Sequence, residues 1–297
     1  MMQENRVDHN VRLEQVQDHI DKMPSLSTTV MKVLEICNRT DTSANDMNRV
    51  ISLDPVLTGK VLKLINSAYY SLPNQVTSLT RAIIILGLNT VKNLALSTAI
   101  LGNLSRRKSK AIPIDAFWSH SIHAGVTAKA IASRKKIPGS LEEYFIAGLL
   151  HDLGKIPLSD CFPLEYRRAM DMVLTKNWPL YHAEKAFFGF DHCLTGRMIA
   201  EKWKLADGFV EALAFHHAPE IAAGENQDLV ANVIIGNHYA HFAETPPTGD
   251  TPSPPPAEMT RALEVSGLEW TDVLALNDEI EMEIEKARIF LQIGIGG

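Results

Sequence analysis

The sequence predicts an all-α protein, and three observations support that prediction. Apolar residues recur every three or four positions, as on one face of an amphipathic helix. Helix-capping residues stand before several of these stretches, and no sustained run alternates apolar with polar residues as a half-buried strand would. The chain has 297 residues, 45% hydrophobic and 22% charged, which is the composition of a globular protein with room for one large domain or two modest ones.

The first half of the chain, residues 23–107, is predicted to form one helical lobe. Residues Ser43–Asp46 have the pattern of a capping box. Asp54-Pro55 supplies an N-cap followed by proline at the first helical position. Ser78 is expected to open a further helix, which Gly87 ends. Each of these signals starts or stops a stretch with helical spacing, so the lobe is built from several short helices.

A junction at Lys108–Pro113 leads into a second helical lobe, 111–244. Its predicted helices lie near Asp115–Arg134, Leu141–Asp152, Leu164–Lys176, His192–Leu205, Gly208–His217 and Leu229–Phe242. Residues 245–256 are rich in proline and are expected to form an exposed loop, because proline interrupts a regular helix. The remaining parts are a polar N-terminal segment, 1–22, and a C-terminal helical segment, 257–297, with a helix from about Thr271 to Ile293.

Charge and cysteine content narrow the possible roles. The formal net charge is −6, and the one dense basic run, Arg106–Lys110, is interpreted as a solvated loop, so nucleic-acid binding is not expected. Cys37, Cys161 and Cys193 are odd in number and show no paired spacing, which indicates a reducing compartment and small buried side chains. The chain opens with polar residues, and its most apolar stretch, Ala82–Leu101, contains polar and charged residues. We therefore expect a cytoplasmic protein without a membrane span.

The pair His151-Asp152 is the first candidate for chemistry. It follows an apolar run and is followed by Gly154, so it is expected at a helix C-terminus, where the backbone turns. Imidazole nitrogen and carboxylate oxygen together suit iron, manganese or zinc. A carboxylate can also bridge two metal ions, as two-metal hydrolysis requires.

Further histidines strengthen the case for a metal. His123, His192, His216 and His217 fall within or near the ends of predicted helices in apolar surroundings. Buried imidazoles need partners, and a shared metal would supply them. Lys155 is interpreted in two ways: it holds a substrate phosphate and neutralises transition-state charge, or it is a surface lysine.

A purely structural explanation stays open. His216 and His217 could cap the end of their helix, where a histidine interacts favourably with the last carbonyl groups. His123 could pack against Trp118. His238 and His241 either support the metal site indirectly or lie outside it.

Motifs along the chain resemble a known family. Residues 149–156 (LLHDLGKI) resemble the signature of the HD superfamily of metal-dependent phosphohydrolases, and His192 with His216-His217 resembles its HD-GYP branch, which hydrolyses cyclic di-GMP. Four motifs in the first half resemble the HDOD family, the HD-related output domain: residues 23–27, 54–57, 66–70 and 82–87. The resemblance implies an all-α, two-lobed HDOD domain, 23–244, with an HD-type bundle in the second lobe.

The resemblance also implies a ligand set. It makes His123 the first metal ligand, His151 and Asp152 the central pair, and His192, His216 and His217 a second metal position. Asp152 and Lys155 would be the catalytic residues. The pattern's final aspartate is replaced by Asn237, on the inward face of its helix, which would weaken one metal position.

Two other departures bear on activity. Ser119 stands one turn before His123, where a three-metal HD-GYP site has glutamate, so one or two divalent ions are expected rather than three. No Gly-Tyr-Pro loop follows His217, which argues against cyclic di-GMP hydrolysis. Iron or manganese is favoured over magnesium or zinc.

Two functional hypotheses follow from the resemblance. The first is a bacterial signal-transduction protein that acts through contact with a partner protein, its metal site being structural or ligand-sensing. The second is a metal-dependent phosphohydrolase acting on a nucleotide or cyclic (di)nucleotide, in which Lys155 steadies the phosphate. A nucleotide is the candidate ligand in both.

Overall fold

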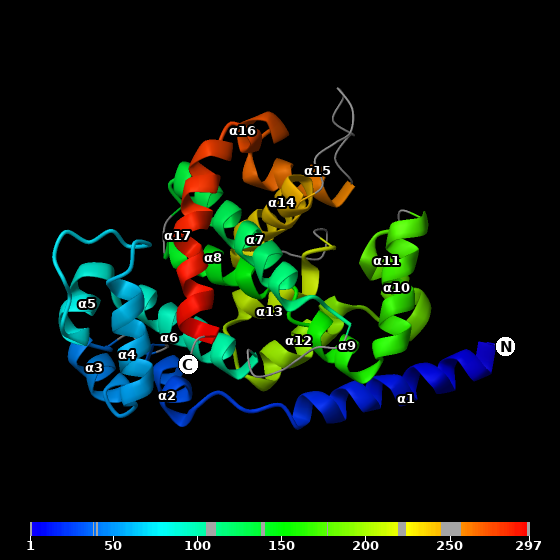
Figure 1. Cartoon of the computed structure of the whole chain (residues 1–297), viewed down its shortest axis with the longest axis horizontal. Coiled ribbons are helices and arrows are strands. Elements are labelled where there is room, and N and C mark those ends of the chain that lie inside the picture. The colour runs from blue at the N-terminus through cyan, green and yellow to red at the C-terminus, as the bar shows by residue number, and fades with distance from the viewer. Residues whose placement is uncertain are drawn as a thin grey trace. The chain divides into compact units, whose positions relative to one another are not determined.

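A computed structural model describes residues 2–37, 39, 41–104, 111–137, 140–176, 178–218, 224–244 and 257–295. Every regular element in these ranges is a helix and none is a strand, which confirms the all-α prediction (Figure 1). The basic run 106–110, residues 219–223 and the proline-rich stretch 245–256 lie outside the described residues.

By its internal contacts the chain divides into two compact units. Unit 1 comprises Met1–Met23, Lys108–Ala124 and Ala147–Glu269, and unit 2 comprises Pro24–Arg107, Gly125–Ile146 and Trp270–Gly297. Each unit therefore draws on three separate stretches, whereas the expected lobes, 23–107 and 111–244, are contiguous. The boundaries fall inside α7 (Ile114–Arg134) and α8 (Leu141–Leu150).

Unit 2 contains most of the first-half helices and the end of the chain. Its helices are α2 (Thr28–Cys37), α3 (Ala44–Ile51), α4 (Pro55–Ile65), α5 (Leu79–Leu86), α6 (Leu88–Leu104), α16 (Trp270–Leu274) and α17 (Asn277–Ile295). The helix α17 packs against α4 and α6, which explains why Trp270–Gly297 belongs to this unit.

The capping signals read from the sequence act as predicted in unit 2. Ser43 and Asp46 form a reciprocal capping box at the start of α3. The Asp54 carboxylate accepts a hydrogen bond from the backbone of Leu57 at the start of α4. Gly87 ends α5 with a φ of 85°, a left-handed value that costs glycine least.

A buried polar group joins parts of unit 2 that are distant in sequence. The Lys129 ammonium donates to the Tyr69 hydroxyl at 2.7 Å and to the Glu142 carboxylate at 2.9 Å. The Tyr69 hydroxyl donates to the second Glu142 oxygen at 3.2 Å. Because all three polar groups are paired with one another, the buried Glu142 charge is compensated.

Unit 1 holds the other helices, and it carries the site. They are α1 (Met2–Asp21), α9 (Lys155–Cys161), α10 (Pro163–Lys176), α11 (Leu180–Phe188), α12 (His192–Lys202), α13 (Asp207–Phe215), the short 3₁₀ helix η1 (Gly224–Asn226), α14 (Gln227–Glu244) and α15 (Ala257–Ser266). Three of these, α1, α9 and α11, were not predicted as helices. The helix α1 is polar over most of its length, α9 has only 7 residues, and α11 has 9 residues and begins directly after Pro179.

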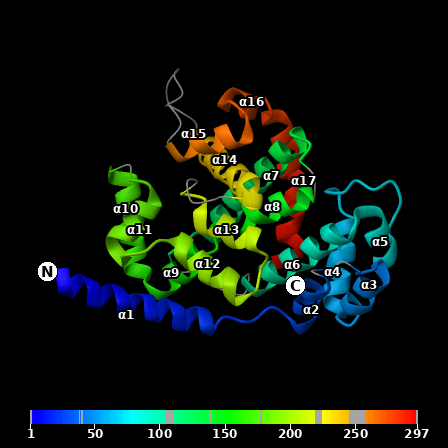
Figure 2. The ribbon, with the colours of Figure 1, turned by 180° about the vertical axis from the view of Figure 1, so that it is seen from behind.

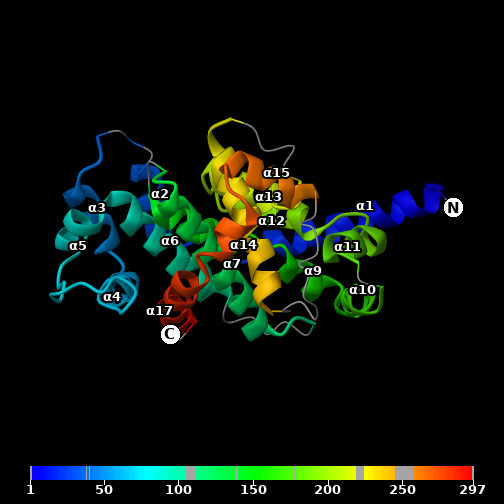
Figure 3. The ribbon, with the colours of Figure 1, turned by 90° about the horizontal axis from the view of Figure 1, so that it is seen from above.

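Neighbouring helices of unit 1 pack in pairs around a core of large side chains. The helix α1 lies along α9 and α12 (Figure 2), and α10 and α11 run side by side, as do α14 and α15 (Figure 3). Trp118, Trp203, Phe209 and Tyr239 are almost fully buried. This apolar packing holds the ends of α8, α12 and α13 in place, and those ends carry the candidate ligands.

In the described part of the chain, no helix by itself has the length and apolarity to cross a membrane. Residues 79–86 and 88–103 meet those criteria only when taken together, and the two segments are bent by 118° relative to each other.

Candidate metal centre

The candidate ligands come from helix ends and helix faces of unit 1. His151 and Asp152 lie in the turn between α8 and α9, His192 is the first residue of α12, and His216 and His217 follow α13 directly. Four of these five side chains, all but His217, have at most 1% of their surface exposed. The interior therefore gathers imidazoles and one carboxylate from distant parts of the sequence.

The His151 ring is fixed so that one nitrogen faces the centre. Its Nδ1–H donates to the Gly148 carbonyl at 2.7 Å. This leaves Nε2 as an acceptor, and Nε2 has no hydrogen-bond partner although it is buried. Burial holds the pKa of His151 well below its usual value, so the ring stays neutral. A neutral imidazole with a free, buried lone pair is suited to bind a cation.

Asp152 lies between two groups of imidazoles. Its Oδ1 is 3.3 Å from His192 Nε2 and 3.7 Å from His216 Nε2. Its Oδ2 is 3.4 Å from His151 Nε2, 3.7 Å from His120 Nε2, and forms an ion pair with Lys155. One carboxylate thus offers a different oxygen to each group, which is the arrangement of a bridging ligand.

The charge of Asp152 is stabilised by its neighbours. Burial alone would raise the pKa of this carboxyl, but the surrounding imidazoles and the Lys155 ammonium together lower it more, and the pKa lies well below its usual value. Asp152 Oδ1 also lacks a hydrogen-bond partner. An ionised, buried carboxylate oxygen without a partner is costly unless a cation is bound to it.

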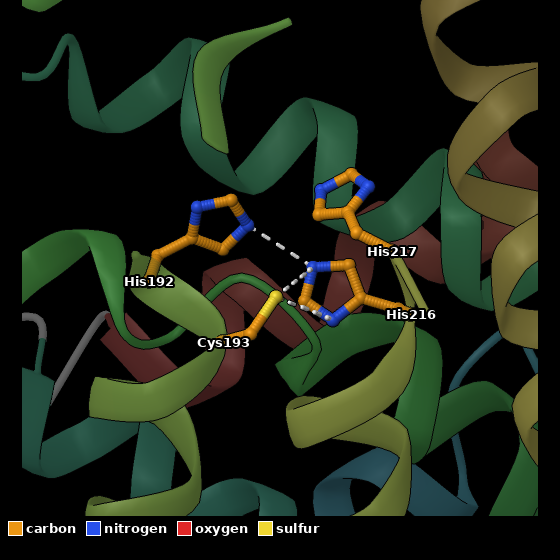
Figure 4. Close-up of side chains that lie close together, drawn as sticks. All are labelled: His192, Cys193, His216 and His217. Carbon is orange, nitrogen blue, oxygen red and sulfur yellow. Dashed lines mark hydrogen bonds between the residues drawn. The ribbon is translucent and has the colours of Figure 1, made fainter. Parts of the chain in front are cut away.

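His192 and His216 point their Nε2 atoms at each other. His192 Nδ1 lies 2.5 Å from the fully buried Glu184 carboxylate, and His216 Nδ1 donates to the backbone carbonyls of Ala212 and Leu213 at 3.2 and 3.1 Å. The two Nε2 atoms are then 3.1 Å apart (Figure 4).

Such a pair needs a positive charge between its nitrogens. Burial would lower the pKa of His216, but Cys193 and Asp152 raise it to about 9, so a positive charge is favoured at this position. A divalent ion would supply that charge in place of a proton. Glu184 orients His192 as a carboxylate behind a metal-binding histidine does.

Cys193 and His217 complete this second group. Figure 4 shows His192, Cys193, His216 and His217 converging from the start of α12 and the end of α13. One ligand atom from each lies within 4.8 Å of all the others. The His217 ring stacks on Tyr181, with 4.3 Å between the ring centroids, and burial keeps the pKa of His217 well below its usual value.

The structure brings His120, rather than His123, to the centre. His120, His151 and Asp152 form the first group of candidate ligands, with His120 buried on α7. His123 instead donates from Nδ1 to the Ser119 carbonyl at 2.8 Å and lies on a partly exposed face. The expectation for His123 therefore does not match the geometry. The two side chains point about 60° apart around the helix axis, and the packing of α7 turns His120 to the interior. Ser119 was singled out only for its position one turn before His123, so it no longer bears on the number of metal ions.

Asn237 lies where the sequence placed it, on α14 and facing the first group. Its side-chain oxygen is 3.0 Å from His120 Nε2, and the residue is 5% exposed. His120 Nδ1 is 3.2 Å from Glu244. Asn237 is close enough to serve as a neutral ligand, and its role as one stays a prediction.

A cavity of about 450 Å³ opens beside both groups. Asp152, Lys155, His192, His216 and His217 lie in its wall. Much of the rest of the lining is apolar and includes Met170, Val173, Trp178, Leu180 and Tyr181 from α10, α11 and the segment between them. This combination of a few polar groups with an apolar lining is typical of a small-molecule site.

Three contributors were missed from the sequence: His120, Glu184 and Cys193. His120 shares a buried helical stripe with Ala124 and Thr127, but His123 lies less than one turn away, so spacing alone did not decide between the two histidines. Glu184 and Cys193 gave no signal in the sequence. Glu184 contacts His192, eight positions away, and Cys193 contacts His216, 23 positions away, and only the fold brings these pairs together.

The residues present fit a metal. Each group contains one buried atom without a hydrogen-bond partner, His151 Nε2 in the first and Asp152 Oδ1 beside the second, and the donor types are those of borderline divalent ions. The buried histidines converge on these two groups, so one explanation, metal binding, accounts for them together and separate roles as helix caps are not required.

Comparison with known proteins gives the same family. The HDOD domain model matches residues 23–219. An uncharacterized protein of Treponema pallidum is 23% identical over 237 residues, 80% of this chain but 45% of the relative, so the chain spans about half of that protein's length.

Solved structures share the fold. An HDOD domain protein of unknown function from Geobacter sulfurreducens has a TM-score of 0.73 at 24% identity, covering 94% of this chain and 97% of that one. A proposed phosphohydrolase from Shewanella amazonensis has a TM-score of 0.69 at 20% identity, covering 94% of this chain and 97% of that one. A proposed signal transduction protein from Marinobacter aquaeolei has a TM-score of 0.71 at 18% identity, covering 97% of this chain and 66% of that one. Because the HDOD model matches about two thirds of its length and its fold is all-helical, this chain belongs to the HDOD family.

Proposed function

We propose that this chain is a bacterial signal-transduction protein whose HDOD region holds a divalent metal centre at Asp152 and responds to a small ligand in the adjoining cavity. The observation that supports the proposal most is the position of Asp152, which offers one oxygen to each of two imidazole groups beside an open cavity. Iron and manganese suit the first group, where nitrogen and oxygen donors are mixed.

The cavity wall defines the class of ligand. A bound metal would supply a Lewis acid for an anionic group. Lys155, on the same side, would hold phosphate oxygens through its ammonium group. Tyr181 and Trp178 offer flat apolar surface for a planar ring. A nucleotide carries both features, and its binding would be passed to a partner protein by contact.

A second candidate function, metal-dependent phosphohydrolysis, is favoured by one specific contact. Lys155 forms an ion pair with the carboxylate that faces both groups, and both residues line the cavity. In that role Asp152 would hold the ions, and Lys155 would neutralise charge on the transferred phosphorus centre. The neutral Asn237 counts against it, because an amide holds a divalent ion less firmly than a carboxylate.

Metal analysis of the purified full chain tests the centre. We expect bound iron or manganese in the wild type and its loss in Asp152→Asn, which keeps the shape but removes the charge. Asp171→Asn on the exposed face of α10 is the matched control and should retain the metal. Equal metal content in wild type and Asp152→Asn would overturn the proposed centre.

A panel of mono-, cyclic and cyclic dinucleotides, with iron, manganese and magnesium supplied in turn, separates the two functions. Ligand-induced stabilisation without phosphate release supports signalling. Turnover that disappears in Asp152→Asn supports hydrolysis and contradicts a purely regulatory role. A panel that neither stabilises the protein nor is hydrolysed contradicts a nucleotide-responsive site.

A further inference from the structure

We infer that Cys193 is a metal ligand, so that His192, Cys193, His216 and His217 form a three-nitrogen, one-sulfur position that prefers a thiophilic ion such as zinc. This inference rests on the proposed metal centre and goes beyond it, because the sequence suggested only a small buried packing role for Cys193. It also separates the two groups around Asp152 by the kind of ion that each one holds.

The four donor atoms lie close enough together to surround one ion, since all of them fall within 4.8 Å of one another. Cys193 Sγ is 3.8 Å from His216 Nε2, and the Nε2 atoms of His192 and His216 are 3.1 Å apart. Around an ion with about 2.0 Å to nitrogen and about 2.3 Å to sulfur, tetrahedral ligands stand roughly 3.3 to 3.5 Å from one another. These two distances differ from the tetrahedral values by a few tenths of an ångström.

The start of α12 places the sulfur there. Asp191 caps the helix by accepting from the Leu194 backbone, and the Thr195 hydroxyl donates to the Gly154 carbonyl at 2.9 Å. These bonds hold the first turn, with His192 and Cys193, against the chain between Asp152 and α9. Cys193 is 6% exposed, so its thiol is removed from bulk water.

The other two cysteines provide an internal comparison. Cys37 and Cys161 are half-buried, and neither belongs to a group of candidate ligands within the described residues. Burial raises the pKa of Cys37 to about 11, so it stays a thiol. Of the three, Cys193 is the one grouped with imidazoles as a candidate ligand within the described residues, and its sulfur adds a soft donor to the three nitrogens of that group.

The donor sets of the two groups differ in chemical character. His120, His151 and Asp152 provide nitrogen and oxygen, which suits manganese or iron. The Cys193 group has no oxygen donor of its own apart from the shared Asp152, and thiolate favours zinc over manganese and magnesium. On binding, the Cys193 thiol gives its proton to solvent and the sulfur donates an electron pair to the ion.

Cobalt(II) absorption of the full chain tests the inference, because a thiolate ligand adds a sulfur-to-cobalt charge-transfer band in the near ultraviolet. We expect the band in the wild type and its absence in Cys193→Ser, with a fall of about tenfold or more in zinc affinity. Cys37→Ser and Cys161→Ser are matched controls and should retain the band. Far-ultraviolet circular dichroism establishes that each variant is folded, and Cys193→Ala provides a second substitution.

The outcomes distinguish this inference from the proposed function. Cobalt that binds in wild type without the band, or a band that persists in Cys193→Ser, overturns the role of Cys193 and leaves the metal centre intact. A wild-type chain that binds no cobalt, zinc, iron or manganese overturns both. His120→Ala should keep the band, since His120 belongs to the other group.

Discussion

At the scale of single residues, we expect opposite effects on metal binding from substitutions at two histidines that lie three positions apart on α7. His120 is buried, with Nε2 3.7 Å from Asp152 Oδ2, while His123 is bonded to the backbone of its own helix. We expect His120→Ala to lower manganese affinity by about tenfold or more and His123→Ala to leave it unchanged. Manganese titration monitored by electron paramagnetic resonance measures both. A loss in His123→Ala with full binding in His120→Ala would contradict the geometry.

The amide of Asn237 leads to a gain-of-binding prediction. Its oxygen is 3.0 Å from His120 Nε2 on the inner face of α14. Asn237→Asp adds a negative charge that a bound cation would neutralise, so manganese should bind more tightly. Each 1.4 kcal/mol of additional binding free energy would lower the dissociation constant about tenfold.

The control for this substitution is Asn45→Asp, which adds the same charge at the exposed first turn of α3. It should change neither affinity nor melting temperature by much. Unchanged manganese affinity in Asn237→Asp would remove residue 237 from the ligand set.

At the scale of elements, the centre depends on how closely α9 approaches α12. A Cβ atom added at Gly154 would lie 1.9 Å from the His192 carbonyl oxygen and 2.5 Å from the Gly196 backbone nitrogen. Both are backbone atoms, so relief requires the two helices to separate. The glycine of the His-Asp-Leu-Gly sequence is thus explained by packing, because its φ of −63° needs no glycine.

We expect Gly154→Ala to lower both the melting temperature and the metal affinity, since separation moves Asp152 away from His192. The loss of stability should reach about 1–3 kcal/mol, as for other overpacked sites. Gly59→Ala in α4 is the control, because nothing lies within 4 Å of its added Cβ. Alanine in a helix should stabilise the protein slightly there. A Gly154→Ala chain that melts and binds metal like wild type would contradict this account.

At the scale of the whole molecule, the sequence predicts what local rules determine. The caps at Ser43 and Asp54 and the end of α5 at Gly87 depend on residues within one turn, and the structure confirms them. The resemblance identified the HDOD family, which the comparisons confirm. The choice between His120 and His123 needed the rotation of α7, and that rotation is set by tertiary packing.

Site residues that come from other helices could not be predicted from local sequence for the same reason. Glu184 belongs to α11 and becomes a partner of His192 only because the turn at Gly189 brings α11 back against α12. Lobes drawn as contiguous ranges differ from the units for a related reason, since α17 packs on α4 and α6.

The division into units leads to a prediction about where metal stabilises the chain. All candidate ligands belong to unit 1, and an ion that binds only the folded state stabilises it by about 2.7 kcal/mol at 100 times its dissociation constant. Adding manganese and zinc should therefore slow amide hydrogen exchange in α9, α12 and α13 while leaving α3, α4 and α5 unchanged, and a chelator should reverse the effect. Hydrogen exchange followed by mass spectrometry resolves these helices separately. Equal slowing in α3–α5 would mean that the centre stabilises more than the unit that contains it, whereas no slowing at all would contradict a metal held by the ends of α8, α12 and α13.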